Sequence, residues 1–261
     1  MTSDIKQDWN PETYAKFRGF RLRPAMDLLA QVPELPAGDV VDLGCGNGPV
    51  GAALALGFSE RRLIGVDNSP AMLAKADQSA AYDELIEADA AKWHPQSRPA
   101  LIFSNALCHW LPDHATLFTR LAGLLTDNGV LAVQMPRQFA APSHQALRDV
   151  ASALFPDRFD FSNYVPPVAP PQHYAKMLAP MGMVSVWETD YIQRLAPVDQ
   201  GHPVRHFTQS TAMRPIAEKL TTDELECFIS AYEEALTAHY PPENDGSVLF
   251  PFKRLFFTLV V

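Results

Sequence analysis

The chain has 261 residues, of which 47% are hydrophobic and 20% charged, a composition typical of a globular protein with a full hydrophobic core. Its formal net charge of −9 argues against a nucleic-acid partner and leaves a small-molecule substrate, anionic if a few arginines converge on it. No run approaches the roughly 18 apolar residues of a membrane span, and neither a secretory start nor paired cysteines are present, so a cytoplasmic protein without membrane contact is expected.

Short apolar runs alternate with helical segments through the first half of the chain. Strands are expected at residues 40–43, 62–67, 85–88, 100–104 and 130–134. Helices are expected at 49–56, at 70–76 and at 117–125, and Ser69-Pro70 supplies an N-cap and a first-turn proline for the second of them. This alternation predicts βαβ units, and hence an α/β fold with a mostly parallel sheet.

The rhythm changes after Pro136, where prolines cluster between helical stretches. A strand is expected at 183–194, an amphipathic helix at 221–240 and a final strand at 250–261. We therefore predict a single domain over residues 1–261, with an N-terminal lid helix at 1–30 and a cofactor-binding core at 30–136. Helical cap insertions are predicted at 137–182 and 196–245, and the last strands of the sheet at 183–195 and 250–261.

A glycine-rich turn, Gly44-x-Gly46-x-Gly48, follows the first predicted strand. Glycines at such a turn let a ligand approach the backbone closely, and an acidic residue at the end of the second strand can accept both ribose hydroxyls. Asp67 occupies that position. The pattern predicts a nucleoside-containing cofactor, with tight strand-to-helix packing as the alternative reason for the glycines.

Three details favour S-adenosylmethionine over a dinucleotide. Pro49 stands where the dinucleotide fingerprint has its third glycine. Asp42 would repel a pyrophosphate but attract the ammonium group of a methionine moiety. Asp89, after the third strand, is placed to accept a hydrogen bond from an adenine amino group, although it could also be a solvated surface charge. A nicotinamide dehydrogenase is thereby disfavoured.

The predicted cofactor-binding residues lie at the ends of the first four strands and on the helix after the second. They are Asp42, Gly44, Cys45, Gly46, Asn47, Asp67, Asn68, Met72, Asp89, Ala90 and Asn105. Met72 could flank the adenine, and packing in the core is its alternative role.

The sequence resembles the trans-aconitate methyltransferase family nearly end to end. The motifs that carry the resemblance include Asp8-Trp9-Asn10-Pro11, Asp42-Leu43-Gly44-Cys45-Gly46, Ser69-Pro70-Ala71-Met72, Trp110-Leu111-Pro112-Asp113-His114, Arg214-Pro215 and Arg254-Leu255-Phe256. The chain departs from the family pattern at Asn47-Gly48-Pro49, His109 and Phe207.

The resemblance implies a class I methyltransferase fold, which is Rossmann-like, with a seven-stranded, mostly parallel sheet, a reversed last strand and a helical cap. It implies an enzyme that uses S-adenosylmethionine to O-methylate a carboxylate of trans-aconitate or a related small acid. By the same resemblance, residues 250–261 form the reversed strand.

A polycarboxylate must be held by cations and hydrogen-bond donors, and the planar fork of arginine matches a carboxylate with two contacts. The arginines at positions 21, 23, 137, 194, 214 and 254 are candidates. The predicted substrate-binding set is Trp9, Tyr14, Arg21, Arg23, Trp110, Arg137, Tyr174 and Arg214.

Methyl transfer to an ionised carboxylate requires no general base. If the acceptor is instead a hydroxyl, carbon or nitrogen atom, His109 is the candidate catalytic base, and a histidine on a loop rim is the alternative for that residue. The histidines have no metal-ligand spacing, so no metal is predicted. A non-catalytic cofactor-binding protein remains a further alternative, and the sequence fixes no oligomeric state.

Overall fold

A computed structural model describes residues 18–209 and 211–261, with side chains of the first helix described from Leu22 onward. The helices are α2 (Arg18–Leu29), α3 (Gly51–Gly57), α4 (Pro70–Asp77), η1 (Cys108–Trp110), α5 (His114–Leu124), α6 (Pro142–Leu154), α7 (Pro171–Leu178), η2 (Ala179–Met181), α8 (Pro203–Gln209), α9 (Arg214–Ala217) and α10 (Thr222–His239). The strands are β1 (Val40–Leu43), β2 (Leu63–Asp67), β3 (Glu84–Glu87), β4 (Leu101–Asn105), β5 (Val130–Pro136), β6 (Met183–Leu195) and β7 (Val248–Val260). None of the described helices is long and apolar enough to span a membrane.

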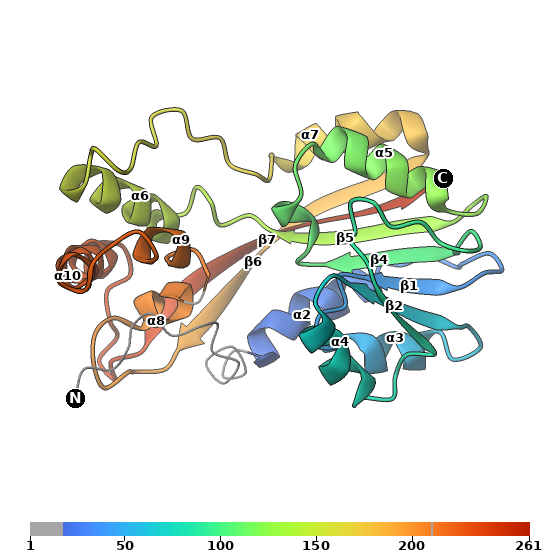
Figure 1. The fold of residues 1–261 in the computed structure, drawn as a ribbon, viewed down its shortest axis with the longest axis horizontal. Coiled ribbons are helices and arrows are strands. Elements are labelled where there is room, and N and C mark those ends of the chain that lie inside the picture. The colour runs from blue at the N-terminus through green and yellow to red at the C-terminus, as the bar shows by residue number, and fades with distance from the viewer. Residues whose placement is uncertain (1–17, 210) are drawn as a thin grey trace. The chain divides into compact units, whose positions relative to one another are not determined.

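The strands form one seven-stranded sheet in the order β3-β2-β1-β4-β5-β7-β6 (Figure 1). The pairs from β3 to β5 are parallel, whereas β7 runs antiparallel to β5. The order reverses between β1 and β4, which is the topological switch point where ligands of doubly wound sheets bind. The predicted α/β, Rossmann-like fold with a mostly parallel sheet and a reversed last strand is confirmed.

The central strands are buried, as their apolar runs predict. Every residue of β1 is buried, and so are the first four residues of β4 and the first six of β5. Burial on both faces is possible because α3 and α4 cover one face of the sheet and α5 and α7 the other (Figure 1). All seven strands start within two residues of their predicted positions.

Two helices begin two or more residues away from their predicted starts. Helix α5 starts at His114 rather than at 117, because Asp113 caps it: the Asp113 carboxylate accepts a hydrogen bond from the Thr116 N–H at 3.2 Å. Helix α3 starts at Gly51 rather than at 49, because the glycine turn continues through Gly48. The capping of α4 by Ser69 is as predicted.

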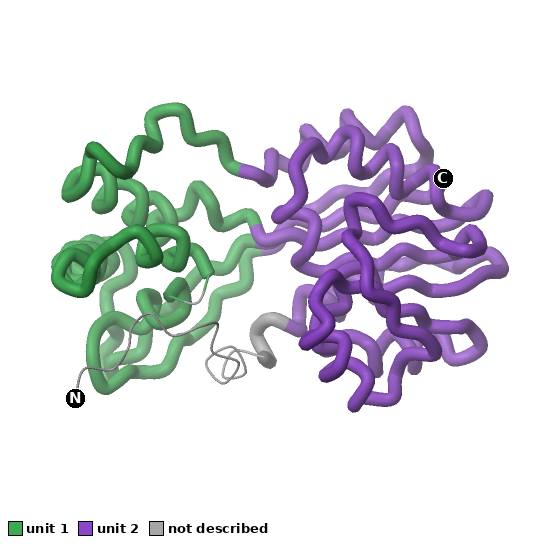
Figure 2. Tube along the Cα trace, in the orientation of Figure 1, with its two compact units in different colours: residues 1–19, 137–166, 190–253 green, residues 20–136, 167–189, 254–261 purple. Residues whose placement is uncertain are grey.

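The chain divides into two compact units (Figure 2). The sheet unit comprises residues 20–136, 167–189 and 254–261, and the helical unit comprises 137–166 and 190–253 among the residues beyond the first helix. This division differs from the predicted boundaries, since α7 lies within the predicted cap insertion 137–182 and yet belongs to the sheet unit. Helix α7 packs against α5 there, which explains its place.

The helical unit is organised around α10, which packs against α6 and α8. Thr221 and Glu224 form a capping box at the N-terminus of α10. The buried Tyr232 hydroxyl donates to the Ser143 carbonyl, and the Ser143 N–H donates to the Tyr240 hydroxyl, both at 3.1 Å. These bonds tie the middle and the C-terminal end of α10 to the start of α6.

Candidate functional site

The glycine turn after β1 has left-handed backbone at Gly44 and Gly46, with φ of +79° and +55°. The Gly44 N–H donates to the Val66 carbonyl at 2.7 Å. A Cβ at Gly44 would lie 2.7 Å from the Leu107 side chain, whereas a Cβ at Gly46 would meet no atom of the described residues within 4 Å. Gly44 is therefore required for packing, and Gly46 leaves open space above the turn for a ligand.

Asp67 ends β2 and holds the turn in place. Its two carboxylate oxygens accept hydrogen bonds from the Gly46 N–H and the Ser69 N–H, each at 2.9 Å. Each oxygen keeps a free lone pair, because a carboxylate offers about four acceptor positions. The side chain is partly exposed, so it can accept two further donors from a ligand. Asn68, which follows it, is exposed.

Asp42 is a buried carboxyl group, only 2% exposed, in the middle of the sheet. The Tyr82 hydroxyl donates to its Oδ2 at 2.7 Å. Burial raises the pKa of Asp42 from 3.8 to about 7, the Tyr82 hydrogen bond opposes that rise, and the nearby Asp67 charge adds to it. A positive group placed beside Asp42 would favour its ionised form.

Tyr82 was not predicted as a site residue. Its ring lies so close to two glycines that a Cβ at Gly51 or Gly65 would come within 2.7 to 2.9 Å of it. The glycines at these positions therefore make room for the ring that carries the Asp42 hydrogen bond. No motif marks this tyrosine, and the small residue inside the β2 strand is the one available signal.

Cys45 and Asn47 complete the predicted turn residues. Cys45 is 3% exposed, and its thiol contacts the Gly46 carbonyl at 3.7 Å. Burial, with the Asp42 and Asp67 charges, raises the pKa of the Cys45 thiol well above its ordinary value, so the thiol stays protonated. Asn47 is partly exposed at the tip of the turn.

The predicted adenine-binding residues lie at the neighbouring strand ends. Asp89 stands two residues beyond the end of β3, is exposed, and caps a turn by accepting from the Ala91 N–H at 2.9 Å. Ala90 is buried, and its carbonyl accepts from Arg120 Nη2 at 2.5 Å. Met72 is partly exposed in the first turn of α4.

A second group of polar side chains lies at the carboxyl ends of β4 and β5. Asn105 ends β4 and pairs in register with Gln134 of β5, which in turn contacts Arg254 of β7. Arg254 is 4% exposed, and its Nη1 donates to Gln134 Oε1 at 3.4 Å. Asn105 Oδ1 and Gln134 Nε2 are both buried without a hydrogen-bond partner among the described residues. Gln134 was missed by the sequence reasoning, although a polar residue inside a strand that is otherwise apolar is a signal.

His109 lies on η1, directly after β4, and is 8% exposed. Burial lowers the pKa of His109 from 6.5 to about 3, and the positive charge of Arg254 and the neighbouring His114 add to that effect. The imidazole is therefore neutral at physiological pH.

Helix η1 is held by His114. One ring nitrogen of His114, Nε2, lies 3.0 Å from the Cys108 carbonyl, and the other, Nδ1, lies 2.7 Å from the Tyr174 hydroxyl. Because the carbonyl can only accept, Nε2 carries the proton and the tyrosine donates to Nδ1. The Tyr174 hydroxyl accepts in turn from the Ala169 N–H at 3.2 Å. Tyr174, predicted as a substrate residue, is fully buried in this role.

The other predicted substrate residues are scattered. Trp9 and Tyr14 lie outside the described residues, and so does the Arg21 side chain. Trp110 is 69% exposed beside His109, and Arg23 lies 3.9 Å from Asp27 on the exposed side of α2. In the helical unit, Arg137 directly follows β5, and Arg214 Nε pairs with Glu218 at 2.6 Å.

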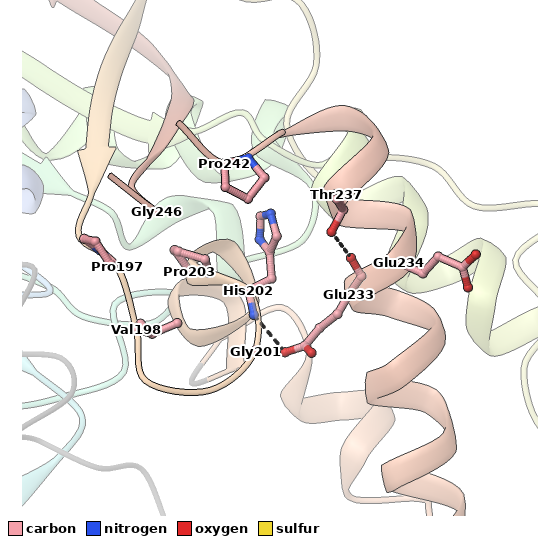
Figure 3. Close-up of a pocket in the computed structure, with 10 residues that line it drawn as sticks. All are labelled: Pro197, Val198, Gly201, His202, Pro203, Glu233, Glu234, Thr237, Pro242 and Gly246. Atoms are coloured by element: carbon pink, nitrogen blue, oxygen red, sulfur yellow. Dashed lines mark hydrogen bonds between the residues drawn. The ribbon is translucent and has the colours of Figure 1, made fainter. Parts of the chain in front are cut away.

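The described part of the chain contains no group of three His, Cys, Asp or Glu side chains arranged to hold a metal ion. A hollow of about 420 Å³ in the helical unit is lined by His202, Glu233 and Glu234, among others (Figure 3). Glu233 is engaged there by the His202 N–H at 3.0 Å and by Arg205 at 2.7 Å. None of the predicted site residues that the structure describes lines this hollow.

The chain is similar to known proteins in sequence and in fold. Residues 40–129 match the family model of the methyltransferase domain. The trans-aconitate 2-methyltransferase of Azoarcus sp. (strain BH72) is 40% identical over 253 residues, which cover 97% of this chain and 98% of that protein. The trans-aconitate 2-methyltransferase of Klebsiella pneumoniae (strain 342) is 40% identical over 251 residues, covering 95% and 96%.

Solved structures share the fold at low sequence identity. The YcgJ protein of Bacillus subtilis superposes with a TM-score of 0.57 at 13% identity, covering 91% of this chain and 97% of that one. A phosphoethanolamine N-methyltransferase of Haemonchus contortus, in complex with S-adenosyl-L-methionine, gives 0.50 at 16% identity, covering 91% and 52%. With relatives 40% identical over nearly its whole length, the chain belongs to the trans-aconitate 2-methyltransferase family.

Proposed function

We propose that this enzyme transfers the methyl group of S-adenosylmethionine to a carboxylate of trans-aconitate or of a closely related small polycarboxylic acid. The observation that carries the proposal is the acidic glycine turn, in which Asp42 is buried just before the turn and a Cβ at Gly46 would meet none of the described residues. Family membership supports the same acceptor class, since the relatives carry that name over their full length.

The residues of the turn fit this cofactor. S-adenosylmethionine supplies a methyl group bound to positively charged sulfur, which makes the methyl reactive without a metal or a covalent intermediate. Asp42 would pair with its ammonium group, and Asp67 would accept from its ribose hydroxyls with the lone pairs left over from Gly46 and Ser69. Asp89, Ala90 and Met72 would border the adenine, with Gly44, Cys45, Asn47, Asn68 and Asn105 completing the predicted contacts.

The acceptor needs orientation rather than activation. A carboxylic acid with an ordinary pKa near 4 is ionised at neutral pH, so its oxygen is already nucleophilic. The enzyme then contributes alignment for an in-line displacement and exclusion of water. A pKa of about 3 makes His109 a weak base, so we assign it a role in binding and not in proton abstraction. The predicted cytoplasmic location and the absence of a nucleic-acid partner stay predictions.

Two measurements test the proposal. Calorimetry should show binding of the demethylated cofactor, S-adenosylhomocysteine, and transfer of a labelled methyl group from S-adenosylmethionine to trans-aconitate should give a base-labile ester. Failure to bind either form of the cofactor would contradict the whole proposal. Methylation of a phenol, amine or carbon acid in preference to any carboxylic acid would support the alternative acceptor. Binding without turnover across the panel would support a non-catalytic protein.

A further inference from the structure

Four polar side chains form a cluster in the sheet unit: His109, Gln134 and Arg254 are buried, and Asn105 is partly exposed with a buried Oδ1. They come from the end of β4, from η1, from β5 and from β7, and β5 lies between β4 and β7 in the sheet (Figure 1). We call this group the β5 cluster. Buried polar side chains cost stability unless they are hydrogen-bonded, so a cluster of four within a sheet core calls for a functional or structural reason.

Two amide atoms of the β5 cluster lack partners. Gln134 Nε2 and Asn105 Oδ1 are buried and make no hydrogen bond within the described part of the chain. The Gln134 amide nitrogen can only donate, so an acceptor oxygen would satisfy it. Rotation of the Asn105 amide by 180° about its last torsion exchanges oxygen and nitrogen, and so places a second donor where the oxygen now lies.

Arg254 adds the positive charge. Its guanidinium has five N–H donors, of which Nη1 donates to Gln134 Oε1 at 3.4 Å. His109 is neutral, so it neither adds a second positive charge to the cluster nor cancels the positive charge of Arg254. The chemistry gathered in the β5 cluster is therefore that of a receptor for an oxyanion with at least two oxygens.

The cluster also stands where a ligand can reach it. Asn105 and the two residues after it are partly exposed at the carboxyl end of β4, next to the switch point between β1 and β4. The glycine turn, which we call the cofactor turn, lies on the other side of this point, because a Cβ at Gly44 would meet the Leu107 side chain. An acceptor held by the β5 cluster would thus lie beside the turn where we place the cofactor.

We propose that Arg254 and Gln134, assisted by Asn105, bind one carboxylate of the methyl acceptor and so determine the specificity of the enzyme for polycarboxylic acids. This assignment rests on the proposed function, because it places the acceptor in the same site. The carboxylate bound there is not the one that is methylated, since an oxygen engaged by a guanidinium is a poor nucleophile. A dicarboxylate is thereby the smallest acceptor that the site can use well.

The test is binding of trans-aconitate to enzyme saturated with S-adenosylhomocysteine, which permits no turnover. Arg254→Met should weaken trans-aconitate binding roughly 10- to 150-fold, as expected for the loss of a charge-assisted hydrogen bond. Its affinity for S-adenosylhomocysteine should stay within about twofold of the wild-type value. The uncharged trimethyl ester of trans-aconitate should bind the two proteins equally.

Gln134→Glu is the second variant, because Arg254→Met could disturb the core. The new carboxylate lies beside Arg254 at the position of the present 3.4 Å contact and should pair with it. This variant should fold, bind S-adenosylhomocysteine normally and lose trans-aconitate binding at least as completely as Arg254→Met. Arg98→Met, which removes an exposed arginine near the start of β4, is the matched control and should behave as the wild type.

The results separate two failures. If the wild-type protein binds no S-adenosylhomocysteine, the proposed function itself is wrong. The second failure arises if the wild type binds the cofactor and methylates trans-aconitate, while folded Gln134→Glu and Arg254→Met bind the acceptor as tightly as the wild type. In that case the β5 cluster only stabilises the fold, and the assignment of the carboxylate site is wrong.

Discussion

The two polar regions of the sheet unit differ in charge and in how the chain builds them. The cofactor turn beside β1 and β2 is acidic, with Asp42 and Asp67 contributing the charges, whereas the β5 cluster is neutral to basic, with Arg254 as its charged member. The turn is assembled from residues 21 positions apart, Gly46 and Asp67, but Gln134 and Arg254 are separated by 120 positions. On these two proposals, a cofactor common to many enzymes would be bound by a local motif, and an acceptor particular to one family would be bound by a tertiary arrangement.

The largest effect is expected at Asp42, where the acidic character of the turn can be removed. Asp42→Asn should weaken S-adenosylhomocysteine binding by roughly 30- to several thousand-fold, because truncating one partner of a buried charge pair costs about 2–5 kcal/mol. Calorimetry at pH 7.5 measures this. A loss below threefold would show that the ammonium group is bound elsewhere and would break the contrast between the two regions.

The same variant should change the stability of the ligand-free protein in the opposite direction. The folded pKa of Asp42, about 7, lies above its unfolded value of 3.8, so the folded state holds a proton that the unfolded state releases between these values. Stability contributed by that proton is complete below about pH 4 and is lost as the pH rises to about 7. Asp42→Asn should remove this dependence and be more stable than wild type at pH 8, by roughly 2–4 kcal/mol at most, in urea unfolding.

The second prediction separates two glycines of one turn. Gly46→Ala should weaken S-adenosylhomocysteine binding by about 10- to 100-fold, because its Cβ enters the space left for the ligand. It should lower the free energy of unfolding by only about 1–2 kcal/mol, the cost of a side chain on left-handed backbone. Gly44→Ala should destabilise the fold more, because its Cβ also meets Leu107 at 2.7 Å. Melting curves and calorimetry on both variants check this. Equal loss of stability at the two positions would contradict the assignment of open space to Gly46.

The cofactor turn could be predicted from the sequence better than the β5 cluster, because its residues lie closer together along the chain. The sequence pattern predicts the strand Val40–Leu43, the turn glycines Gly44 and Gly46, and Asp67, because a strand, a turn and an acidic residue follow one another closely along the chain. Tyr82 could not be predicted, since its contact with Asp42 spans 40 positions and depends on the space at Gly51 and Gly65. Arg254 was one candidate arginine among six, and burial beside Gln134 distinguishes it. Exposed Arg214, by contrast, is occupied by Glu218 four positions on.

Tyr82 provides the third prediction, with a smaller effect. Tyr82→Phe removes the hydrogen bond that stabilises ionised Asp42, so the pKa of Asp42 should rise by about one to two units above its present value near 7. Carbon-13 NMR of labelled aspartate in the ligand-free protein measures the shift. At pH 7 the affinity for S-adenosylhomocysteine should fall by roughly tenfold, since less of Asp42 is ionised.

A control variant keeps that result specific. Tyr164→Phe alters a partly buried tyrosine of the helical unit and should leave the Asp42 titration unchanged. An unchanged or lowered Asp42 pKa in Tyr82→Phe would show that the hydroxyl group does not control the acidic turn.

The smallest effect is expected at His109, which tests whether the β5 cluster binds or also performs acid–base chemistry. Because the pKa of His109 is about 3, its ionisation should leave no break in the dependence of kcat on pH between 5 and 8. His109→Gln should lower kcat by less than about tenfold at saturating substrates, whereas removal of a general base typically costs 10²- to 10⁴-fold. His94→Gln, at an exposed position, is the matched control. A hundredfold loss of kcat in His109→Gln, together with a break near pH 6 in the wild-type profile that disappears in the variant, would show that His109 acts as a base. The methyl acceptor would then be a group that must lose a proton, and not a carboxylate.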